Sequence, residues 1–370
     1  SLALSTCGDA TAGFIMCLLV CNDTATTEIY TRSLVGSVRC VKRQGQNIID
    51  WSKEGLLGDV DAVAAANGWD AALPQAVKDF TKIEGHYVSA PTNVHRTDMI
   101  WASKLAFDAI GADFPKTWTE FNALAPKFLE AGILPLAHGG QAWQEVYMFE
   151  AVALGVGGAD FYKSALVELK EESLRSDTMV AVFKQLAELR AMVDENAPGR
   201  DWNLATAMVI NGQAAMQIMG DWAKGEFLAA GKAPGEDFLC SSTPGNGYLY
   251  VVDSFAMFDV DGDDKKAGQN LLAYLIMGPN FQEVFNLNKG SIPARTDVAL
   301  DKFESCAHTS AADMAASSDE GSLLPSYAHG MALRGAQAGA ITDVVTAHFN
   351  SDMSSADAVK MLADAVANSL

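Results

Sequence analysis

The sequence predicts an α/β protein, because helical and strand-like segments alternate along most of its length. From about residue 47 onward, apolar residues spaced three and four apart alternate with short runs of consecutive apolar residues. Capping residues and glycine stops mark the ends of several helical segments. The chain has 370 residues, 49% of them hydrophobic, which suffices for two globular domains with separate cores.

The first well-marked elements begin at Thr117. Thr117 and Glu120 form a capping box and Gly132 supplies the stop, so we expect a helix over 118–131. The following segment "ILPLAHGG" is typical of a short buried strand that runs into a glycine loop. An amphipathic helix capped by Ser176 comes next. Its apolar face consists of Met179, Val182, Phe183, Leu186, Leu189 and Val193.

The alternation continues to the C-terminal end. A helix in "NLATAMVIN", a break at Gly212 and the strand "AAMQIM" lead to a helix that opens near Asp221. Residues 248–258 are rich in strand-forming residues. Two helices divided at Gly278-Pro279 follow, and the tail "SADAVKMLADAVANSL" predicts a last helix capped by Ser354 or Ser355.

The charge balance restricts the possible partners. The 46 acidic and 26 basic residues give a formal net charge of -20, which repels nucleic acid and anionic membrane surfaces. No apolar stretch reaches the ~20 residues of a membrane helix. The apolar run 12–21 has no basic residue before it, since the first is Arg32, so we do not interpret it as an export signal. We expect a neutral or cationic small partner.

The six cysteines fall into two groups. Four crowd the N-terminus, whereas Cys240 and Cys306 stand far downstream, and none forms a C-x-x-C motif of the zinc or redox type. Two interpretations of the downstream pair stay open. They form a single disulfide in an exported protein, or they are two isolated buried thiols.

Enzyme and cofactor motifs are absent from the sequence. It has no G-x-S-x-G elbow, no P-loop and no H-E-x-x-H, and "GVGGAD" departs from the dinucleotide fingerprint at Asp160. The acidic run 259–264 does not match a calcium loop, because Gly262 comes too early and Asn270 stands where a glutamate is required. We therefore expect no catalytic residues, no cofactor and no metal.

Several aromatic and polar residues occur where strands give way to loops. Strand ends in α/β folds are common binding places, because loop amides and helix N-termini converge there. A sugar needs directed donors and acceptors for its hydroxyls and a flat apolar surface for its C–H faces. Taken singly, each residue has an ordinary alternative role as core packing, surface charge or turn. The set is His95, Arg96, Gln141, Trp143, Trp222, Asp253, Lys289 and His329.

Four segments carry a resemblance to a known family. The runs "GHYVSAPTNVHRTDMIWASKLAFDAIG", "TWTEFNALAPKFLEAGILPLAHGGQAWQ", "APGRDWNLATAMVINGQAAMQIMGDWAKGEF" and "FQEVFNLNKGSIPAR" resemble the sugar-binding subunits of bacterial ABC importers. The blocks "GRDWN", "GDWAKGEF" and "KGSIPAR" are similar to the periplasmic glucose/mannose-binding branch, and more distantly to maltose-binding protein. The resemblance covers about residues 47–370.

The resemblance implies a type II periplasmic-binding fold with two α/β lobes closing over one monosaccharide such as glucose or mannose. It implies an N-terminal lobe (N-lobe) of residues 47–94 and 250–295 and a C-terminal lobe (C-lobe) of residues 95–249 and 296–370. The partners would be the sugar and the membrane permease, with the binding protein a periplasmic monomer that performs no reaction. The alternatives are a glycoside hydrolase and a sugar-sensing partner of a chemoreceptor.

The resemblance also implies roles for individual residues. Trp222 resembles the stacking tryptophan of the C-lobe, and the other seven residues of the set above fall on cleft positions of the family. One departure concerns the position two residues before Asp253. Related sequences commonly have an asparagine there and this chain has Val251. The substitution removes one hydroxyl partner.

The first 46 residues do not follow the family. They lack the expected strand, tryptophan pair, long helix and lysine-bearing loop, and residues 22–44 resemble translated sequencing-adapter DNA. We interpret residues 1–46 as a non-family segment produced by an assembly artefact and joined to the family body at about Gly45. A divergent natural N-terminus is the alternative. The artefact would leave the N-lobe incomplete, without its export signal, and impaired in folding and binding.

Overall fold

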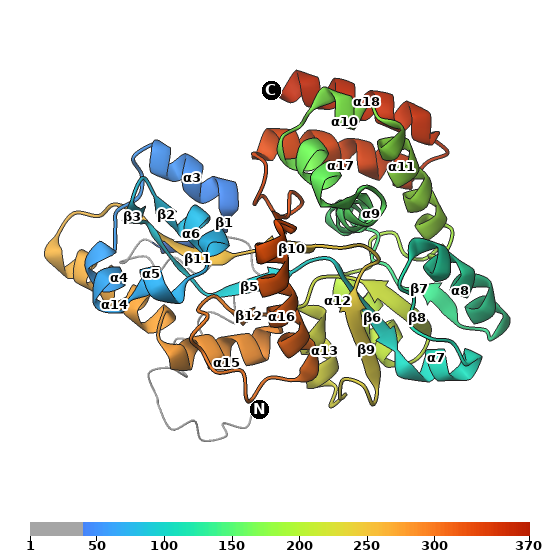
Figure 1. Cartoon of the computed structure of the whole chain (residues 1–370), viewed down its shortest axis with the longest axis horizontal. Helices are drawn as coiled ribbons and strands as arrows, with labels where there is room; N and C mark the ends of the chain where they lie inside the picture. Colours follow the sequence, from blue (N-terminus) through green and yellow to red (C-terminus); the bar gives the residue numbers. More distant parts are fainter. Residues whose placement is uncertain (1–39) are drawn as a thin grey trace.

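Two lobes lie side by side in the computed structural model, which describes residues 40–370 (Figure 1). Each lobe has its own sheet flanked by helices, and a third sheet lies between them (Figure 1). The chain passes from one lobe to the other several times, so neither lobe is a continuous segment. This confirms the two-lobe α/β fold predicted from the sequence.

The N-lobe sheet has the order β1-β11-β4, with both pairs antiparallel. Its strands are β1 (Cys40–Gln44), β11 (Asp253–Met257) and β4 (Ser89–Pro91), with a separate hairpin of β2 (Lys82–Ile83) and β3 (His86–Tyr87). Its helices are α3 (Gly45–Lys53), α4 (Asp61–Ala66), α5 (Trp69–Ala72), α6 (Gln75–Thr81), α14 (Asp263–Ile276) and α15 (Pro279–Lys289). The core between them includes the fully buried Trp69, Val77 and Met257.

The C-lobe sheet has the order β7-β8-β6-β9. Its strands are β7 (Leu134–Leu136), β8 (Ala214–Ile218), β6 (Met99–Ser103) and β9 (Phe238–Ser242). The helices are α7 (Lys104–Ile110), α8 (Trp118–Glu130), α9 (Ala142–Tyr162), α10 (Glu171–Leu174), α11 (Asp177–Arg190), α12 (Trp202–Ile210), α13 (Ala223–Ala229), α17 (Gly335–Phe349) and α18 (Ser355–Ser369). A short π-helix over Lys163–Val167 continues α9.

The sheet between the lobes contains the crossing strands. Its order is β12-β5-β10-β13, with bounds Ile292–Pro293, Asn93–Arg96, Tyr248–Val251 and Leu323–Pro325. The chain enters the C-lobe through β4, β5 and β6 and returns through β9, β10 and β11. Helix α16 (Ser305–Glu320) stands beside these crossings (Figure 1). Side chains on β5 and at the start of β11 therefore lie at the junction of the lobes.

Local sequence signals predicted the helix ends well. The predicted capping box is present at α8, where Glu120 N donates to Thr117 Oγ1 and Thr117 N donates to the Glu120 carboxylate, both at 3.1 Å. Ser354, rather than Ser355, caps the last helix. In α11 the predicted apolar face is buried except for Val193, because the helix ends at Arg190 and Val193 lies in the following turn.

The expected boundary after residue 46 needs correction. Cys40–Gln44 form the edge strand β1, in which Gln44 lies opposite Asp253, and the backbone N–H of Gln46 donates to Gly330 O at 2.8 Å. Residues 40–46 are therefore part of the N-lobe. A strand edge needs a partner, and β11 supplies it. The strands, helix and export signal expected to be missing fall on residues 1–39, outside the described residues.

The assignment of all residues from 296 onward to the C-lobe also needs correction. Phe303, Ala307 and Met314 pack into the N-lobe core, and Thr296 N donates to Ala72 O at 2.8 Å. The chain contributes again to the large C-lobe core at Leu324, Tyr327 and Leu333, before α17. Sequence resemblance identified the family but not this late crossing, since crossings depend on contacts between distant segments.

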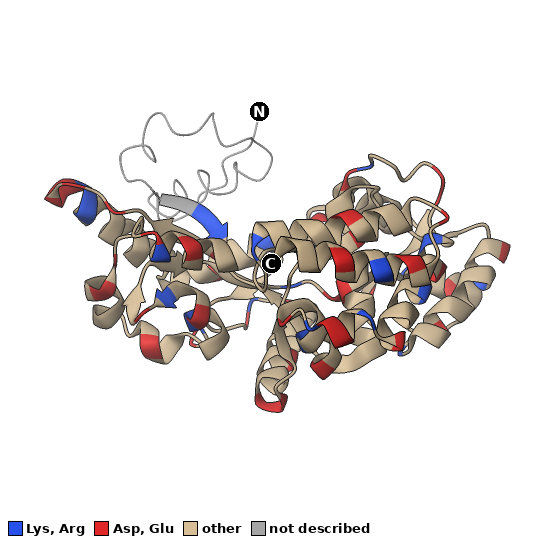
Figure 2. Ribbon diagram, turned by 90° about the horizontal axis from the view of Figure 1, so that it is seen from above, with Lys and Arg blue, Asp and Glu red and all other residues tan. Residues whose placement is uncertain are grey.

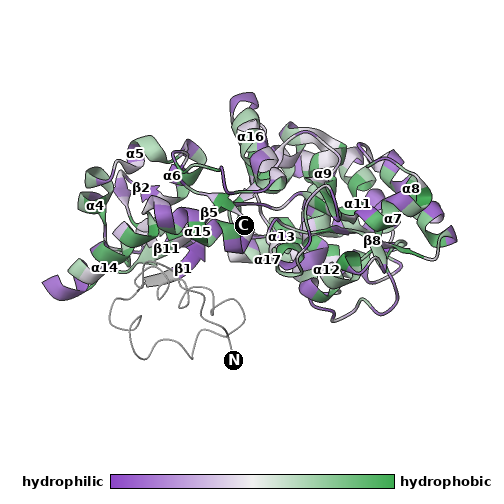
Figure 3. Cartoon of the chain, turned by 90° about the horizontal axis from the view of Figure 1, so that it is seen from below, coloured by the Kyte–Doolittle hydropathy of each residue, from purple (hydrophilic) through white to green (hydrophobic). Residues whose placement is uncertain are grey.

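Figures 2 and 3 show how charged residues and hydropathy are distributed over the two lobes. Hydrophobic residues colour most of β8, whereas the outer end of α14 is hydrophilic (Figure 3). Acidic residues are spread over both lobes (Figure 2). Within residues 40–370, no helix is long and apolar enough to cross a bilayer. In the same range, no three His, Cys, Asp or Glu side chains are grouped to hold a metal ion.

Candidate functional site

The candidate site lies where the crossing strand β5, the start of β11 and the turn after β8 meet. The structure brings together five of the residues selected from the sequence, through ring contacts or side-chain contacts: His95, Trp143, Trp222, Asp253 and His329. Lys289 acts on this group through its charge. Gln141 contacts this group through a hydrogen bond from Trp143, whereas the Arg96 side chain has other partners.

Trp222 is the centre of an aromatic wall. Its ring makes edge-on contacts with His95, Tyr147 and His329, at centroid distances of 5.2, 5.5 and 5.5 Å. Tyr147 also contacts Trp143 at 5.6 Å and His329 at 4.8 Å. Tyr147 and Trp143 lie one turn apart on α9 and so share a face of that helix. We call these five rings the aromatic wall.

Two glycines, Gly220 and Gly290, allow close contacts around Trp222. Gly220 leaves the space that the six-membered ring of Trp222 occupies. Gly290 ends α15 of the N-lobe at φ +88, and a Cβ built there would lie 2.6 Å from Asp221 O. The N-lobe helix α15 therefore reaches the turn that carries Trp222, which belongs to the C-lobe.

Asp253 is the centre of the polar part of the site. Its side chain is buried, and Lys42 Nζ lies 3.0 Å from its Oδ2 while Gln44 Nε2 donates to its Oδ1 at 2.6 Å. Lys42 and Gln44 lie on one face of β1, because alternate residues of a strand point the same way. Asn93 Oδ1 accepts from Asp253 N at 3.1 Å. Burial opposes ionisation, yet Lys42 and His95 hold the pKa of Asp253 well below its usual value.

His95 lies between two buried carboxylates. Its Nδ1 makes a short contact with Asp221 Oδ1, and its Nε2 lies 3.5 Å from Asp253 Oδ2. Burial lowers the pKa of His95, but the neighbouring carboxylates outweigh burial and the net pKa is raised. Asp221 follows β8 of the C-lobe and Asp253 opens β11 of the N-lobe. His95, on the crossing strand, therefore contacts both lobes.

His329 has the opposite electrostatic setting. Burial, together with the positive charges of His95 and Lys42, lowers the pKa of His329 to about 3. Its imidazole is therefore neutral near pH 7 and offers one donor and one acceptor. It is held by the turn after β13, where His329 N donates to Ser326 Oγ at 3.4 Å.

Arg96 and Gln141 have other partners. Arg96 Nη2 lies 3.1 Å from Asp98 Oδ2, Arg96 Nη1 lies 2.6 Å from Asp313 Oδ2, and the guanidinium stacks over Tyr248. Neighbouring residues of a strand point to opposite faces, so Arg96 faces away from the site that His95 enters. Gln141 Oε1 accepts from Trp143 Nε1 at 2.8 Å, which fixes the orientation of that ring.

Several residues of the site were missed from the sequence, and Asn93 is one of them. Lys42 and Gln44 fell in the segment assigned to an artefact, Asp221 was interpreted only as the start of a helix, and Tyr147 had no loop signal. The i, i+4 spacing of Trp143 and Tyr147 was the one available indication for Tyr147. No local pattern indicated Lys42, whose partner Asp253 is more than 200 residues away in sequence.

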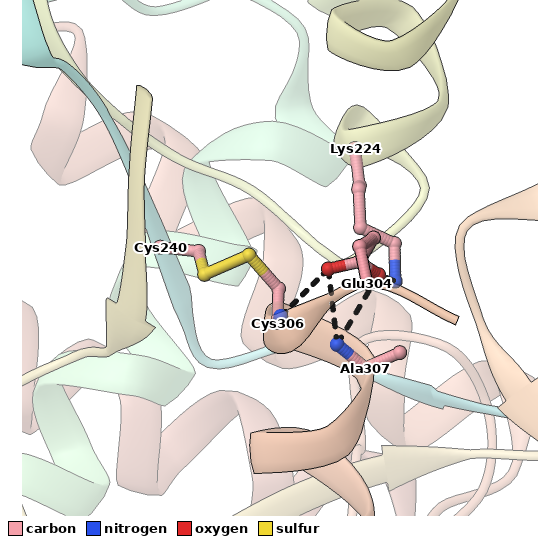
Figure 4. The surroundings of a disulfide bond; sticks show 5 residues. All are labelled: Lys224, Cys240, Glu304, Cys306 and Ala307. Atoms are coloured by element: carbon pink, nitrogen blue, oxygen red, sulfur yellow. Dashed lines mark hydrogen bonds and ion pairs between the residues drawn. A yellow bond between two sulfur atoms is a disulfide. The ribbon is translucent and has the colours of Figure 1, made fainter. Parts of the chain in front are cut away.

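Cys240 and Cys306 form a disulfide, which decides between the two interpretations of this pair. The bond joins β9 of the C-lobe to the first turn of α16, and an ion pair of 2.5 Å between Lys224 and Glu304 lies beside it (Figure 4). Glu304 also accepts from the backbone of Cys306 and Ala307, so it caps α16 (Figure 4). Helix α16 is thus attached to the C-lobe although it packs on the N-lobe core.

A surface depression of about 430 Å³ lies elsewhere on the C-lobe. It is lined by Phe114, Lys116 and residues 239–245 among others. None of the aromatic wall contributes to it, and among residues 40–370 Lys116 is the one charged residue that lines it. We give it no role in the site.

The chain is similar to known proteins over most of its length. The family described as bacterial extracellular solute-binding protein matches residues 41–276. A probable sugar-binding periplasmic protein of Brucella suis biovar 1 is 47% identical over 345 residues, which is 92% of this chain and 82% of that protein. The match to residues 41–46 agrees with the corrected start of the N-lobe.

Solved structures share the fold. The bacterial solute receptor AcbH, described as having an exclusive substrate preference for β-D-galactopyranose, has a TM-score of 0.75 and 19% identity, covering 91% of this chain and 87% of its own. Maltose-bound MalE3 of T. maritima has a TM-score of 0.67 and 17% identity, and the match covers 90% of this chain and 84% of MalE3. At these identities the likeness concerns the maltose-binding-protein-like fold alone.

Proposed function

Because the chain belongs to the bacterial extracellular solute-binding protein family, we propose that it is the sugar-binding subunit of an ABC importer, acting in the periplasm. Its ligand is a monosaccharide such as glucose or mannose, bound between the lobes. Its protein partner is the membrane permease, and it binds as a monomer. The relatives are named for binding rather than for a reaction, so the glycoside hydrolase alternative is not retained.

One observation carries the proposal: the aromatic wall faces the same junction as the polar group around Asp253. His95 belongs to both, since its ring contacts Trp222 while its Nε2 lies 3.5 Å from Asp253 Oδ2. An indole offers a flat surface for the C–H face of a sugar ring. The ionised carboxylate of Asp253 accepts sugar hydroxyls, and the ammonium of Lys42 donates to them.

The size of the ligand is inferred from how closely the two parts approach. The ring centroids within the aromatic wall are about 5 to 6 Å apart, and Asp253 already has Lys42, Gln44 and Asn93 around it. A compact neutral sugar with several hydroxyls suits such a group better than a long oligosaccharide. In the proposed site, Trp143, Trp222, Lys289 and His329 join Asp253 and His95, while Arg96 and Gln141 hold the strand and the wall in place.

The crossing strands supply the mechanism of uptake. Residues of both lobes meet at His95, so a sugar that contacts both lobes favours the closed arrangement over the open one. The free energy available to the shift is the difference in sugar affinity between the two arrangements. The closed lobes then present a different surface to the permease than the open lobes do.

Titration calorimetry with a panel of monosaccharides tests the proposal. The panel comprises glucose, mannose, galactose and xylose, with maltose as the larger competitor. We expect saturable one-to-one binding of a hexose and weaker binding of maltose. Tight binding of maltose with none of the monosaccharides would contradict the proposed ligand, and binding of no sugar would contradict the proposed function.

A further inference from the structure

Asp221 connects the two halves of the proposed site through its contact with His95, one of the five rings of the aromatic wall. The residue is 2% exposed, and each carboxylate oxygen has its own donor. Oδ1 faces His95 Nδ1, and Oδ2 accepts from the backbone N–H of Arg96 at 3.0 Å. Both donors come from adjacent residues of β5, so the carboxylate is fixed against the crossing strand.

The contact with Asp221 decides which nitrogen of His95 faces the site. Nδ1 must carry a proton to bind a carboxylate, which leaves Nε2 as the atom that gains or loses one. Nε2 lies 2.9 Å from Asn93 Nδ2 and 3.5 Å from Asp253 Oδ2. The neutral ring accepts from Asn93 through Nε2. The charged ring points Nε2–H at Asp253, and the Asn93 amide then has Ser291 Oγ, at 3.2 Å, as its acceptor.

The charges around His95 come from four other elements. Asp221 precedes α13, Asp253 opens β11, Lys42 lies on β1 and Lys289 ends α15. His329, in the turn after β13, is neutral because burial and the charges of His95 and Lys42 lower its pKa. The carboxylates raise the pKa of His95 and burial opposes them. The charge on His95 is therefore set chiefly by Asp221 and Asp253.

We propose that Asp221 is a positioning residue of the sugar site: it holds the Nδ1 proton of His95, so that Nε2 is the nitrogen presented to Asn93, Asp253 and the sugar. The inference rests on the proposed function for its ligand. It adds a coupling between the lobes, because Asp221 belongs to the C-lobe and Asp253 to the N-lobe. A sugar hydroxyl that takes a place beside Nε2 changes the contact through which the lobes meet.

The substitution Asp221→Asn tests the proposal. An amide places an NH₂ group against one of the two N–H donors and removes the negative charge. We expect the affinity for the best monosaccharide to fall about tenfold or more. We also expect a pH dependence of affinity in the wild type with a midpoint above pH 6.5, and a midpoint at lower pH in Asp221→Asn, since the charge that favours imidazolium is lost.

Asp313→Asn is the matched control. Asp313 is a partner of Arg96, the neighbour of His95 on β5, and Arg96 keeps Asp98 as a second carboxylate. We expect its affinity and pH midpoint to stay within about twofold and a few tenths of a pH unit of the wild type. An Asp221→Asn protein with wild-type affinity, or with an unmoved midpoint, would overturn the proposal, as would an affinity that does not vary with pH in the wild type.

Nitrogen NMR of the wild-type protein labelled at histidine covers the case in which Asp221→Asn does not fold. We expect His95 Nδ1 to stay protonated across the titration while Nε2 changes state. A neutral His95 with the proton on Nε2 would overturn the proposal. This result does not depend on sugar. If no sugar binds while Nδ1 stays protonated, the proposed function fails and the positioning role of Asp221 stands.

Discussion

Gly220 and Trp222 share one space, because the indole of Trp222 lies where a side chain at Gly220 would be. A Cβ built on Gly220 overlaps carbon atoms of the six-membered ring of Trp222. The ring is the flexible partner in this contact and must move if position 220 acquires a methyl group. The glycine therefore sets the position of the aromatic wall.

We expect Gly220→Ala to displace the indole of Trp222 and to weaken sugar binding by about tenfold, a cost of about 1.4 kcal/mol. Calorimetry gives the affinity, and tryptophan fluorescence reports the changed environment of the ring. The control is Gly339→Ala in α17, where a Cβ meets nothing within 4 Å. It should stabilise the protein by about 0.5–1 kcal/mol and leave binding unchanged. Equal affinities in both variants would refute this role for Gly220.

Trp222→Ala removes the centre of the aromatic wall. Since an aromatic residue at the heart of a binding site commonly contributes about 2 kcal/mol or more, we expect the affinity to fall by tenfold to a hundredfold. Trp202→Ala is the control, because Trp202 packs in the same C-lobe cluster but makes no ring contact with the wall. It should lower the melting temperature and keep the affinity. A loss of binding in Trp202→Ala as large as in Trp222→Ala would mean that only folding is being measured.

Features that depend on one short segment were predicted from the sequence, whereas features that depend on contacts between distant segments were not. Helices α8, α11 and α18 were predicted closely because their caps and apolar faces lie within one segment. The late crossing at α16 was not predicted, because its contacts join Met314 to N-lobe residues far upstream in the sequence. The same distinction explains which residues of the site were selected from the sequence and which were missed. Trp222 and Asp253 stand at strand ends, whereas Lys42 is recognisable only once β1 is paired with β11.

Strand geometry explains why adjacent residues differed in outcome. His95 and Arg96 were selected together, but they face opposite sides of β5, so only His95 enters the site. Which side faces the site depends on the register with β10, where His95 lies opposite Val251. Val251, noted as a departure from the family, is itself buried beside this strand. The sequence of β5 alone does not reveal this register, because it depends on pairing with the distant strand β10.

Lys42→Met tests whether β1 belongs to the site. The side chain of Asp253 is 2% exposed and its ion pair with Lys42 measures 3.0 Å. Loss of the ammonium should lower the free energy of unfolding by about 2 kcal/mol and the sugar affinity by about tenfold. Lys82→Met is the control, since Lys82 is about as exposed but pairs with Asp70, whose side chain is 68% exposed. It should cost less than about 1 kcal/mol and leave binding intact. Larger losses of stability and of sugar affinity in Lys82→Met than in Lys42→Met would contradict a role for Lys42 in the site.

Removal of the disulfide by Cys240→Ala with Cys306→Ala should destabilise the protein. The bond spans 66 residues, and a cross-link of this kind commonly contributes about 2–4 kcal/mol. Urea unfolding of the double variant and the wild type measures the difference. The ion pair of Lys224 with Glu304 still attaches α16 to the C-lobe, so we expect the sugar affinity to change less than about threefold. A double variant as stable as the wild type would show that the bond adds nothing to stability.

Glu150 gives the folded protein a stability that depends on pH. The side chain is fully buried on α9, and it accepts from Thr97 Oγ1 at 2.9 Å and from Ser326 Oγ at 2.8 Å. Burial disfavours its carboxylate and raises the pKa of Glu150 from 4.5 to about 7, although these hydrogen bonds oppose the rise. Between these two pH values the folded protein keeps a proton that the unfolded chain has released. The free energy of unfolding therefore decreases as the pH rises from 4.5 to 7, by roughly 3 kcal/mol in total.

Glu150→Gln should remove this part of the pH dependence, because an amide does not titrate. The variant loses one acceptor for the hydroxyls of Thr97 and Ser326, so its stability at pH 5 should be lower than that of the wild type. The informative quantity is the slope: urea unfolding at pH 5, 6 and 7 should show a smaller decrease in the variant than in the wild type. Parallel slopes would contradict the raised pKa of Glu150. Because Ser326 also binds the backbone of His329, a loss of sugar affinity in the variant would locate the effect at that turn.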